Sequence, residues 1–287
     1  MSRPSASGIS LIVVSACAFG AMAIFARFAY ASGANVTGIL SARFAIAGAL
    51  LTAIMLLTGR RWPRGRPLLV AVGMGAIGYV GQAACFFAAL NYASAGLVAL
   101  LLYAYPTLVV LLSAAFLHEK LTAARLALLA LSFAGLALTL GGGQGTATGI
   151  ALGLAAAGFY SVYIVIGARE LGHVDALAST TVVCLSAAAT LALSALVMEP
   201  RFPGAAWGWA AIGAIAIVST VVAILAFFAG LKRVGPAVAS IVSTLEPVVT
   251  VALAWMVLGE SLTALQLAGG SVVLVCAALL ARGKNRG

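Results

Sequence analysis

The stretch "FFAALNYASAG", Phe86–Gly96, decides how the chain is organised, because a related stretch, "FFAGLKRVGPA", begins 141 residues later at Phe227. Laying the sequence over itself at this spacing, without a gap, brings further matching residues together. Pro106 meets Pro247, Glu119 meets Glu260, and the "LTA" at Leu121 meets the "LTA" at Leu262. Self-similarity at a fixed spacing indicates repeated structural units. We therefore expect two copies of one unit, residues 1–143 and 144–287.

The composition indicates the solvent in which these units fold. Hydrophobic residues make up 64% of the 287 residues, charged residues make up only 8%, and the mean hydropathy is +1.18. So few charges cannot cover a water-soluble domain of this size. Apolar runs of about twenty residues recur along the chain, which is the length that an α-helix needs to cross a bilayer. The sequence therefore predicts an all-α, multi-pass membrane protein.

Turn residues and charges divide the chain into ten expected transmembrane helices. The first is too long for the apolar core of a signal peptide, so we expect it to be retained. Each unit then holds five helices, an odd number, so the second unit must be inverted relative to the first. Inverted repeats are typical of secondary transporters, which give alternating access to one central site. The expected helices cover residues 8–30, 35–57, 67–90, 94–117, 123–141, 148–168, 174–197, 206–230, 235–258 and 263–281.

The positive charges predict the orientation of these helices. With a cytoplasmic N-terminus, the cytoplasmic segments hold 13 of the 16 Lys and Arg residues, and only Arg27, Arg43 and Arg201 lie elsewhere. An excess of Lys and Arg marks the cytoplasmic side. We therefore expect both termini in the cytoplasm and the protein in a bacterial cytoplasmic (inner) membrane. The basic balance then reflects contact with anionic lipid headgroups, not with nucleic acid.

The loops test the inversion independently. "NYAS", Asn91–Ser94, is uncharged and is expected outside, whereas its counterpart "KRVG", Lys232–Gly235, is basic and is expected as a cytoplasmic turn. "HEKLTAAR", His118–Arg125, is basic and expected inside, whereas its counterpart "GESLTALQ", Gly259–Gln266, has lost both basic residues. The matching loops have exchanged charge, as an inversion requires.

Sequence signatures of catalysis are missing. The chain has no HExxH, GxSxG, Walker A or CxxC motif, and its two histidines, His118 and His173, fall in expected loops. We therefore expect no enzymatic activity, no cofactor and no metal. Cysteines inside apolar runs are more often small buried hydrophobic residues than a disulfide set. This applies to all four, Cys17, Cys85, Cys184 and Cys276.

Five of the seven tyrosines lie deep within expected helices, away from the interfacial belts that tyrosine favours. Polar side chains on one face of an apolar helix point either at a polar cavity or at neighbouring helices. In the second case, each interhelical hydrogen bond contributes about 0.6 kcal/mol. An aromatic, hydroxyl-rich wall suits flat, amphipathic solutes, including cationic ones. Positions i, i+3 and i+7 share a helix face, as Tyr79, Gln82 and Phe86 do. The full set of candidate substrate-binding residues is Tyr79, Gln82, Phe86, Tyr103, Tyr160, Tyr163, Ser243, Thr244 and Glu246.

Glu246 and Arg43 are charged residues that lie well inside their expected helices. Glu246 lies about 17 Å from the inner end of its helix, at 1.5 Å per residue. It is expected to relay protons, to neutralise a substrate amine or to form half of an ion pair. The alternative is a protonated carboxyl that bonds the carbonyl freed by Pro247. Arg43 is expected to pair with Glu246, to attract a substrate carboxylate or to snorkel to the outer headgroups, and Arg27 is expected to snorkel.

Pro106 and Pro247 interrupt two helices at equivalent positions of the repeat. Each proline leaves a carbonyl without its helical donor, which is tolerable in a membrane only where protein or water satisfies it. Paired kinks in inverted halves predict two hinges. A kink that only shapes the packing is the alternative.

The sequence resembles the drug/metabolite transporter superfamily, EamA type. The resemblance is carried by "ARFAIAGALL" in the second expected helix and by "FFAALNYASAGLVALLLYAYPTLVVLLSAAFLHEKLT" and "FFAGLKRVGPAVASIVSTLEPVVTVALAWMVLGESLT" in the two halves. It implies a ten-helix carrier whose central cavity is lined by helices one, three, four, six, eight and nine. These helices carry Tyr79, Gln82, Tyr103, Tyr160 and Tyr163. The tyrosine-rich interior is most similar to YddG-type exporters of aromatic amino acids, which also expel flat cationic toxicants.

One departure from internal symmetry concerns Arg43. The "RF" of the second helix has no copy in the seventh, where "STTVVCL" stands, so we assign Arg43 no symmetric role.

The expected function is a secondary transporter that exports aromatic or apolar amino acids, or related metabolites, by alternating access. The alternative is a multidrug efflux carrier for lipophilic cations with Glu246 as counter-charge. The expected partners are a small-molecule substrate and the lipid bilayer, without nucleic acid, and proton coupling depends on Glu246.

Overall fold

A computed structural model describes residues 6–117, 122–141 and 145–283, and every regular element in these ranges is a helix. Eight helices are long and apolar enough to cross a membrane, and Leu126–Leu140 and Ala264–Leu280 form two shorter apolar helices. The prediction of an all-α, multi-pass membrane protein is confirmed. The ten expected spans overlap these eight long and two shorter helices, and the count of ten membrane crossings stays a prediction. His118, Glu119 and Lys120 lie outside the described residues.

Several expected spans consist of two or three helical pieces. The pieces follow one another along the chain, separated by short breaks or by a change of helix type. The elements are α1 (Ala6–Gly20), α2 (Met22–Ala31), α3 (Val36–Leu57), α4 (Arg66–Gly73), η1 (Met74–Tyr79), α5 (Val80–Ala89), α6 (Ala95–Leu102), α7 (Tyr105–Leu117), α8 (Ala123–Gly141), α9 (Ala147–Glu170), α10 (Ala176–Ser194), α11 (Ala206–Ala216), η2 (Ile217–Val222), α12 (Ala223–Ser243), α13 (Leu245–Leu258) and α14 (Ala264–Gly283).

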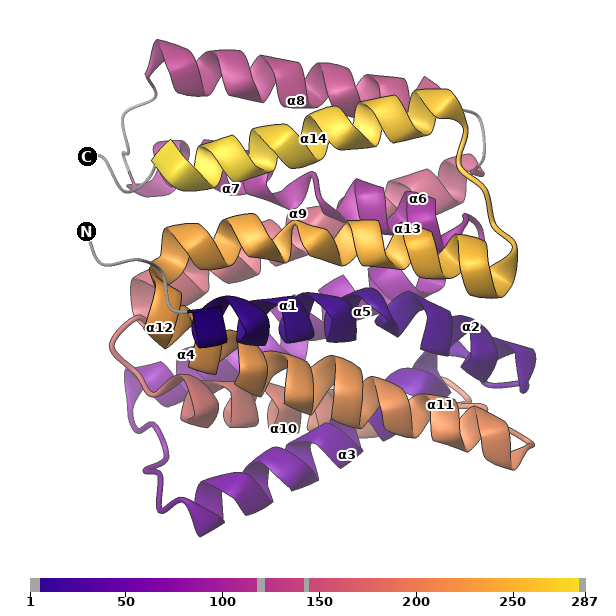
Figure 1. Cartoon of the computed structure of the whole chain (residues 1–287). Coiled ribbons are helices and arrows are strands. Elements are labelled where there is room, and N and C mark those ends of the chain that lie inside the picture. Colours follow the sequence, from indigo (N-terminus) through magenta and orange to yellow (C-terminus); the bar gives the residue numbers. More distant parts are fainter. Residues whose placement is uncertain (1–5, 118–121, 142–144, 284–287) are drawn as a thin grey trace.

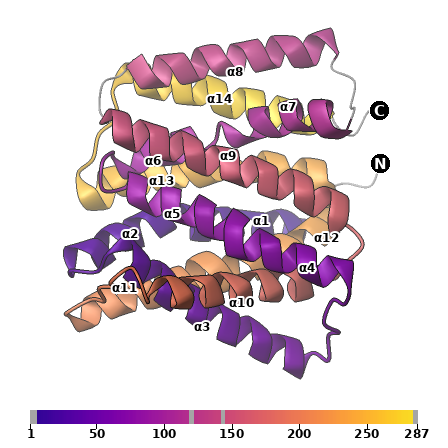
Figure 2. The same ribbon diagram turned by 180° about the vertical axis from the view of Figure 1, so that it is seen from behind.

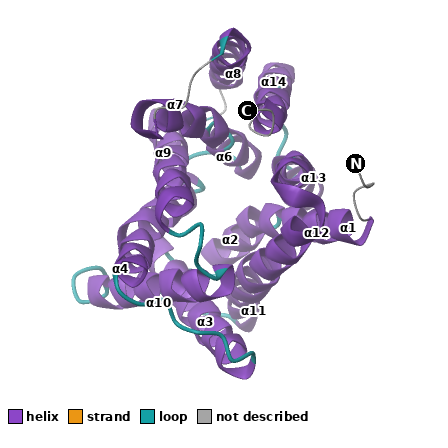
Figure 3. Cartoon of the chain, turned by 90° about the vertical axis from the view of Figure 1, so that its left-hand side faces the viewer, coloured by secondary structure: helices purple, strands orange, loops and turns teal. Residues whose placement is uncertain are grey.

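The two halves of the chain are interleaved. The most extensive helix contacts join α1 to α12, α8 to α14, α3 to α10 and α5 to α9, and each pair takes one helix from each half. Figure 1 shows α8 beside α14 at one edge of the bundle and α3 near α10 at the other, and Figure 2 shows the same from behind. In Figure 3, α4 and α9 lie on one side, opposite α1, α12 and α13. α1 begins and α14 ends at the same end of the bundle (Figure 1).

Three spans contain a short break in the helix. α1 gives way to α2 at Ala21, α6 gives way to α7 at residues 103–104, and α12 gives way to α13 at Thr244. Pro106 and Pro247 lie in the first turns of α7 and α13. A proline there removes an N–H group that has no intrahelical partner anyway, so it starts a new helix without a penalty. The prolines therefore mark true breaks in the helices.

Two further spans contain a π-helical turn instead of a break. η1 and η2 overlap on the repeat spacing, because residues 76–79 of η1 correspond to residues 217–220 of η2. A π-turn widens the helix and is frequent at functional sites. The shared position of the two turns indicates that they belong to the repeated unit.

One expected turn is wrong. The "KRVG" segment was expected to separate the eighth and ninth spans, but α12 carries helical backbone through it. Lys232 and Arg233 are good helix formers, so the connection does not require a break in the backbone. The membrane-length segments on either side are Ala206–Val234 and Ile241–Leu258. Figure 1 shows the chain reversing direction between α11 and α13.

The cysteines form no disulfide, and all four are free. Cys184 and Cys276 are buried and Cys85 is partly buried, as expected of small hydrophobic residues. Cys17 is exposed on the outside of α1 instead. An apolar thiol on a surface that faces lipid carries no burial requirement.

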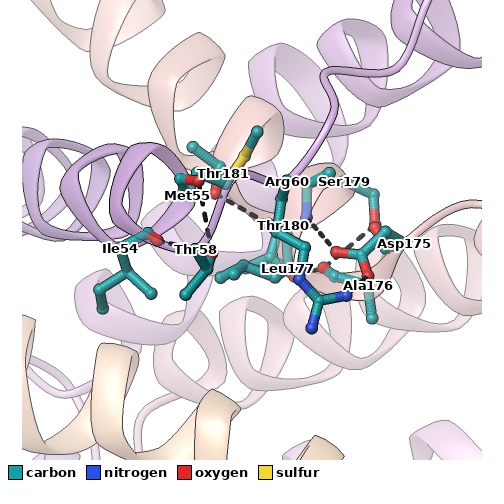
Figure 4. A network of polar contacts seen from close by, with 11 residues as sticks. Ile54, Met55, Thr58, Arg60, Asp175, Ala176, Leu177, Ser179, Thr180 and Thr181 are labelled. Carbon is teal, nitrogen blue, oxygen red and sulfur yellow. Dashed lines mark hydrogen bonds and ion pairs between the residues drawn. The ribbon is translucent and has the colours of Figure 1, made fainter.

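At the end of the bundle where α1 begins, the loop before α4 is tied to the start of α10 (Figure 4). Asp175 accepts a hydrogen bond from the backbone N–H of Ala178 at 3.1 Å, which caps α10, and a second from Arg60 Nη1 at 2.6 Å. Arg66 forms a two-point pair with Glu170, with N–O distances of 2.9 and 3.0 Å. Asp175 therefore serves both as a helix cap and as the anchor of the loop.

The cap and the ion pair of Asp175 are separable by mutation. Asp175→Ala removes an N-cap and should lower the free energy of unfolding by about 1 kcal/mol. Arg60→Ala should lower it by less than about 0.5 kcal/mol, because the pair is half exposed and screened by water. Thermal unfolding in detergent measures both variants. Equal losses would show that the ion pair, not the cap, stabilises this end.

Candidate functional site

A cavity of about 30 Å³ lies where the broken helices meet. Its wall includes Gln82, Phe86, Tyr103 and Glu246 from the predicted set, together with Arg43. This volume accommodates about one water molecule, whereas sites for small molecules have several hundred Å³. A ligand larger than water therefore requires the surrounding helices to move apart.

The position of the cavity follows from the helix breaks. Five residues at helix breaks line the cavity. Phe19 and Met22 flank the break between α1 and α2, and Tyr103 directly follows α6. Glu246 and Pro247 lie in the first turn of α13. Irregular backbone at membrane depth is tolerated only where it is buried in protein or borders a cavity. The sequence therefore creates the cavity with the same residues that interrupt the helices.

The hydroxyl of Tyr103 connects two of the broken spans. It lies 2.7 Å from the carbonyl oxygen of Ser243 and 3.0 Å from Oε2 of Glu246. The Ser243 carbonyl is four residues before Pro247, which has no N–H to offer it. The expected alternative gave this carbonyl to Glu246, but the structure gives it to Tyr103.

This arrangement restricts the position of a proton. A tyrosine hydroxyl has one hydrogen, and a carbonyl oxygen can only accept. When Tyr103 donates to Ser243, its contact with Glu246 is a hydrogen bond only if the carboxyl carries a proton. When Glu246 is ionised, it competes with the carbonyl for the same hydrogen. The geometry thus accommodates both protonation states of Glu246.

Arg43 is buried, with 2% of its surface exposed, so the expectation that it snorkels is wrong. Its Nε donates to Oγ1 of Thr220 and its Nη2 donates to the hydroxyl of Tyr79, both at 3.0 Å. On the repeat spacing, Tyr79 in η1 and Thr220 in η2 are equivalent residues. Arg43 therefore bridges the same position in the two halves.

Aromatic rings enclose the guanidinium of Arg43. Its central carbon lies 5.0 Å from the ring centre of Phe44 and 5.6 Å from those of Tyr79 and Phe87. Among the described residues, Arg43 forms no ion pair, so the expected pairing with Glu246 is not made in this conformation. Both charges nevertheless line the same cavity.

The five deep tyrosines and Phe44 form one continuous chain of ring contacts. The chain connects the buried cation to the partly buried carboxylate, because Tyr79 contacts Arg43 and Tyr103 contacts Glu246. The structure records no hydrogen bond from the hydroxyls of Tyr105, Tyr160 and Tyr163 to another described residue. The successive centroid distances are 5.0 Å for Phe44–Tyr79, 5.9 Å for Tyr79–Tyr163, 6.3 Å for Tyr163–Tyr160, 4.6 Å for Tyr160–Tyr105 and 5.6 Å for Tyr105–Tyr103.

Some predicted site residues do not line the cavity. Tyr79 accepts a hydrogen bond from Arg43 instead. Tyr160 and Tyr163 reach the cavity only through the chain of rings. Ser243 contributes its backbone carbonyl, and the hydroxyl of Thr244 bonds the carbonyl of Ile241 at 2.6 Å. Sequence reasoning missed Phe19, Met22 and Phe87, which are hydrophobic residues without a distinguishing pattern.

Arg27 does not snorkel either, because a carboxylate lies within reach. Its Nη2 donates to Oε1 of Glu260 at 3.0 Å and to the carbonyl of Ala93 at 3.1 Å. The other carboxylate oxygen of Glu260 accepts from the backbone N–H of Ala95 at 2.7 Å, the first residue of α6. This cluster connects α2, the start of α6 and the segment between α13 and α14.

A multi-pass helical bundle with interrupted helices around a small, charged cavity belongs to the class of membrane transport proteins. The comparison of sequences identifies the family: the chain belongs to the EamA-like transporter family, whose model matches it twice, at residues 6–141 and 147–282. The chain is 27% identical to the "Uncharacterized transporter YcbK" of Bacillus subtilis (strain 168), covering 95% of this chain and 92% of the relative.

The fold also matches a solved structure. That structure is described only as a crystal structure of a protein, and it aligns with a TM-score of 0.70 at 24% sequence identity. The alignment covers 98% of this chain and 99% of the other. The similarity concerns the fold alone.

The hydroxyl of Tyr103 should contribute to stability, whereas that of Tyr105 should not. Tyr103→Phe leaves the carbonyl of Ser243 without its donor and the carboxyl of Glu246 without its hydroxyl partner, which should cost about 1–3 kcal/mol. Tyr105→Phe is the matched control, because it removes a hydroxyl for which no hydrogen bond is recorded. Thermal unfolding in detergent compares them, and equal stability of the two variants would contradict the assigned bonds.

Proposed function

We propose that the protein is a secondary transporter that exports aromatic or apolar amino acids, or closely related metabolites, from the cytoplasm by alternating access. The observation that carries the proposal is the chain of tyrosine rings that connects Arg43 to Glu246 beside the cavity. Aromatic rings favour offset or edge contacts with other rings, so a flat side chain gains most from this wall. Within the family, the ring wall supports a role like that of the YddG-type exporters of aromatic amino acids.

The transporter has two inverted units of five transmembrane helices each in this proposal. Three observations support the inversion. The family model matches each half once. On the repeat spacing, α5 corresponds to α12, α7 to α13, and α9 to α1. The contact of α5 with α9 therefore corresponds to that of α12 with α1. In the same way, the contact of α7 with α9 corresponds to that of α13 with α1. The π-turns η1 and η2 overlap on the repeat.

The membrane orientation follows from the charges. The loop before α4, with Arg60, Arg61 and Arg64, lies at the end of the bundle where α1 begins and α14 ends. Because Lys and Arg mark the cytoplasmic side, both termini face the cytoplasm. In this orientation, the cluster of Arg27 and Glu260 lies on the outer side of the cavity.

Glu246 exchanges a proton for the substrate amine in this mechanism. With a proton, its carboxyl shares a hydrogen bond with Tyr103; without one, it is an anion near the N-terminus of α13, where the helix dipole favours negative charge. Pro106 and Pro247 act as hinges at which α7 and α13 tilt. The breaks that precede α7 and α13, together with the wide turns η1 and η2 in other spans, let the wall of the cavity open.

The specificity is tested by uptake into liposomes that hold only this protein. In a screen of all twenty amino acids, we expect accelerated counterflow of labelled tryptophan, phenylalanine and tyrosine, because the ring wall favours flat side chains. Liposomes without protein are the control. Uptake of leucine with none of tryptophan or phenylalanine would overturn the aromatic preference, and no counterflow of any amino acid would overturn amino acid transport.

A second candidate, efflux of lipophilic cations, is favoured by the partly buried carboxylate of Glu246 among aromatic rings. A quaternary amine added to the same liposomes separates the two functions. Transport of the amine without any amino acid counterflow would support this second function. Competition with tryptophan for one site would show that the amino acid site also admits cations.

The proton role of Glu246 predicts a defined pH response. Between about pH 5.5 and 8, wild-type transport should change with pH, because the carboxyl must gain and lose its proton once in each cycle. Glu246→Gln keeps the hydrogen bond to Tyr103 but cannot ionise, so its residual transport should not change with pH. Transport by the variant with wild-type rate and pH profile would exclude the relay.

The hinges predict a loss of rate without a loss of binding. Pro247→Ala restores the N–H and lets α12 continue into α13, so it should slow transport by about tenfold if straightening costs about 1.4 kcal/mol. Substrate binding by the purified variant should stay near that of the wild type. Pro203→Ala, in the segment before α11, is the matched control. If Pro247→Ala transports at the wild-type rate, Pro247 is not a hinge and its kink only shapes the packing of the helices.

A further inference from the structure

We propose that Arg43 binds the carboxylate of a zwitterionic substrate while Glu246 binds its amine, so that this pair of charges defines the substrate class as α-amino acids. The inference deepens the proposed function and rests on it. It assigns to Arg43 a specificity that an efflux carrier for cations would not need.

The hydrogen bonds of Arg43 leave it donors to spare. A guanidinium has five N–H donors, and the recorded bonds use Nε, toward Thr220, and Nη2, toward Tyr79. Nη1 has no recorded partner among the described residues, yet it is not one of the fully enclosed polar atoms that lack a partner. Arg43 lines the cavity, and Nη1 keeps the N–H donors that a ligand there would need.

The groups that contact the guanidinium of Arg43 stabilise its positive charge but carry no negative charge to neutralise it. The described groups that contact the guanidinium are the hydroxyls of Thr220 and Tyr79 and the rings of Phe44, Tyr79 and Phe87, all uncharged. A buried cation needs a paired anion to be tolerated at low cost. The other described carboxylates include Glu260, Asp175 and Glu170, and each is paired with a different arginine. The recorded contacts of Arg43 therefore include no anion, and a ligand carboxylate in the cavity that it lines would supply one.

Arg43 and Glu246 fit the two ends of one small ligand. They border the same cavity without forming an ion pair, so a molecule between them needs a negative group on one side and a positive group on the other. An α-amino acid has both on one carbon. The planar fork of arginine matches a carboxylate with two parallel hydrogen bonds. The side chain of the substrate then meets the chain of tyrosines.

The positions of these residues also explain why the site is rigid on the arginine side. Three rings and two hydrogen bonds fix the guanidinium before a substrate arrives. Preorganised donors lose little freedom on binding. The cavity of about 30 Å³ is much smaller than a site for a small molecule. Binding an amino acid therefore requires the cavity to open around the fixed guanidinium.

The experiment compares phenylalanine with its methyl ester, which keeps the amine and the ring but has no carboxylate. In proteoliposomes that hold the wild type, the free acid should compete for labelled phenylalanine about 10- to 100-fold more strongly than the ester, the range for a charge-assisted hydrogen bond. Arg43→Gln should lose this preference: affinity for the acid falls by the same factor, and affinity for the ester stays the same. Arg43→Lys should retain part of it. Arg64→Gln, in the exposed loop before α4, is the matched control and should behave as the wild type.

The outcomes separate this inference from the proposed function. Wild-type transport of phenylalanine with equal competition by acid and ester would overturn the role of Arg43 alone. So would an Arg43→Gln variant that weakens acid and ester equally, because that result marks a structural residue. A wild type that transports neither compound would overturn the proposed function together with this inference. If Arg43→Gln does not fold, the comparison of acid and ester on the wild type still decides.

Discussion

A polar group in the hydrocarbon core of a bilayer must find its partner within the protein, and this constraint shapes the centre of the molecule. The chain breaks three helices and widens two others, and each interruption frees backbone groups that lipid cannot satisfy. The hydroxyl of Tyr103 satisfies the carbonyl that Pro247 cannot bond, and Oγ1 of Thr250 reaches the carbonyl of Gly20 at the end of α1. The interruptions are tolerated because they support one another around a shared cavity.

Much of the fold could be predicted because hydrophobic runs and turn residues report directly on membrane crossings. The helices overlap the expected spans, and the five deep tyrosines proved to be connected. The π-turns could not be predicted, since a single extra residue in a helix leaves no mark on an apolar pattern. The partner of Arg27 was missed for a different reason: a sequence shows that Glu260 exists, but not that it lies 3.0 Å away.

In the candidate site, too, some residues could be predicted from the sequence and others could not. Gln82, Phe86, Tyr103 and Glu246 could be found because polar or aromatic residues are conspicuous in an apolar helix. The role of Arg43 stayed open among three alternatives, because each depends on the direction of a long side chain. Burial eliminates snorkelling, and the absence of a recorded pair with Glu246 separates the two charges in this conformation. Only the folded arrangement decides between these alternatives.

The backbone of the two halves is related by the repeat, but their charges are not. On the repeat spacing, Arg43 corresponds to the buried Cys184, and Glu246 corresponds to Tyr105. A second arginine at Cys184 would repel the first across the contact between α3 and α10, since like charges in a poorly screened interior destabilise each other. A repeated scaffold therefore requires an asymmetric set of charges to hold a single central site. Arg43 contacts the equivalent residues Tyr79 and Thr220, so one cation is bonded to both halves of the chain. A motion of one half relative to the other must therefore stretch or break one of these hydrogen bonds.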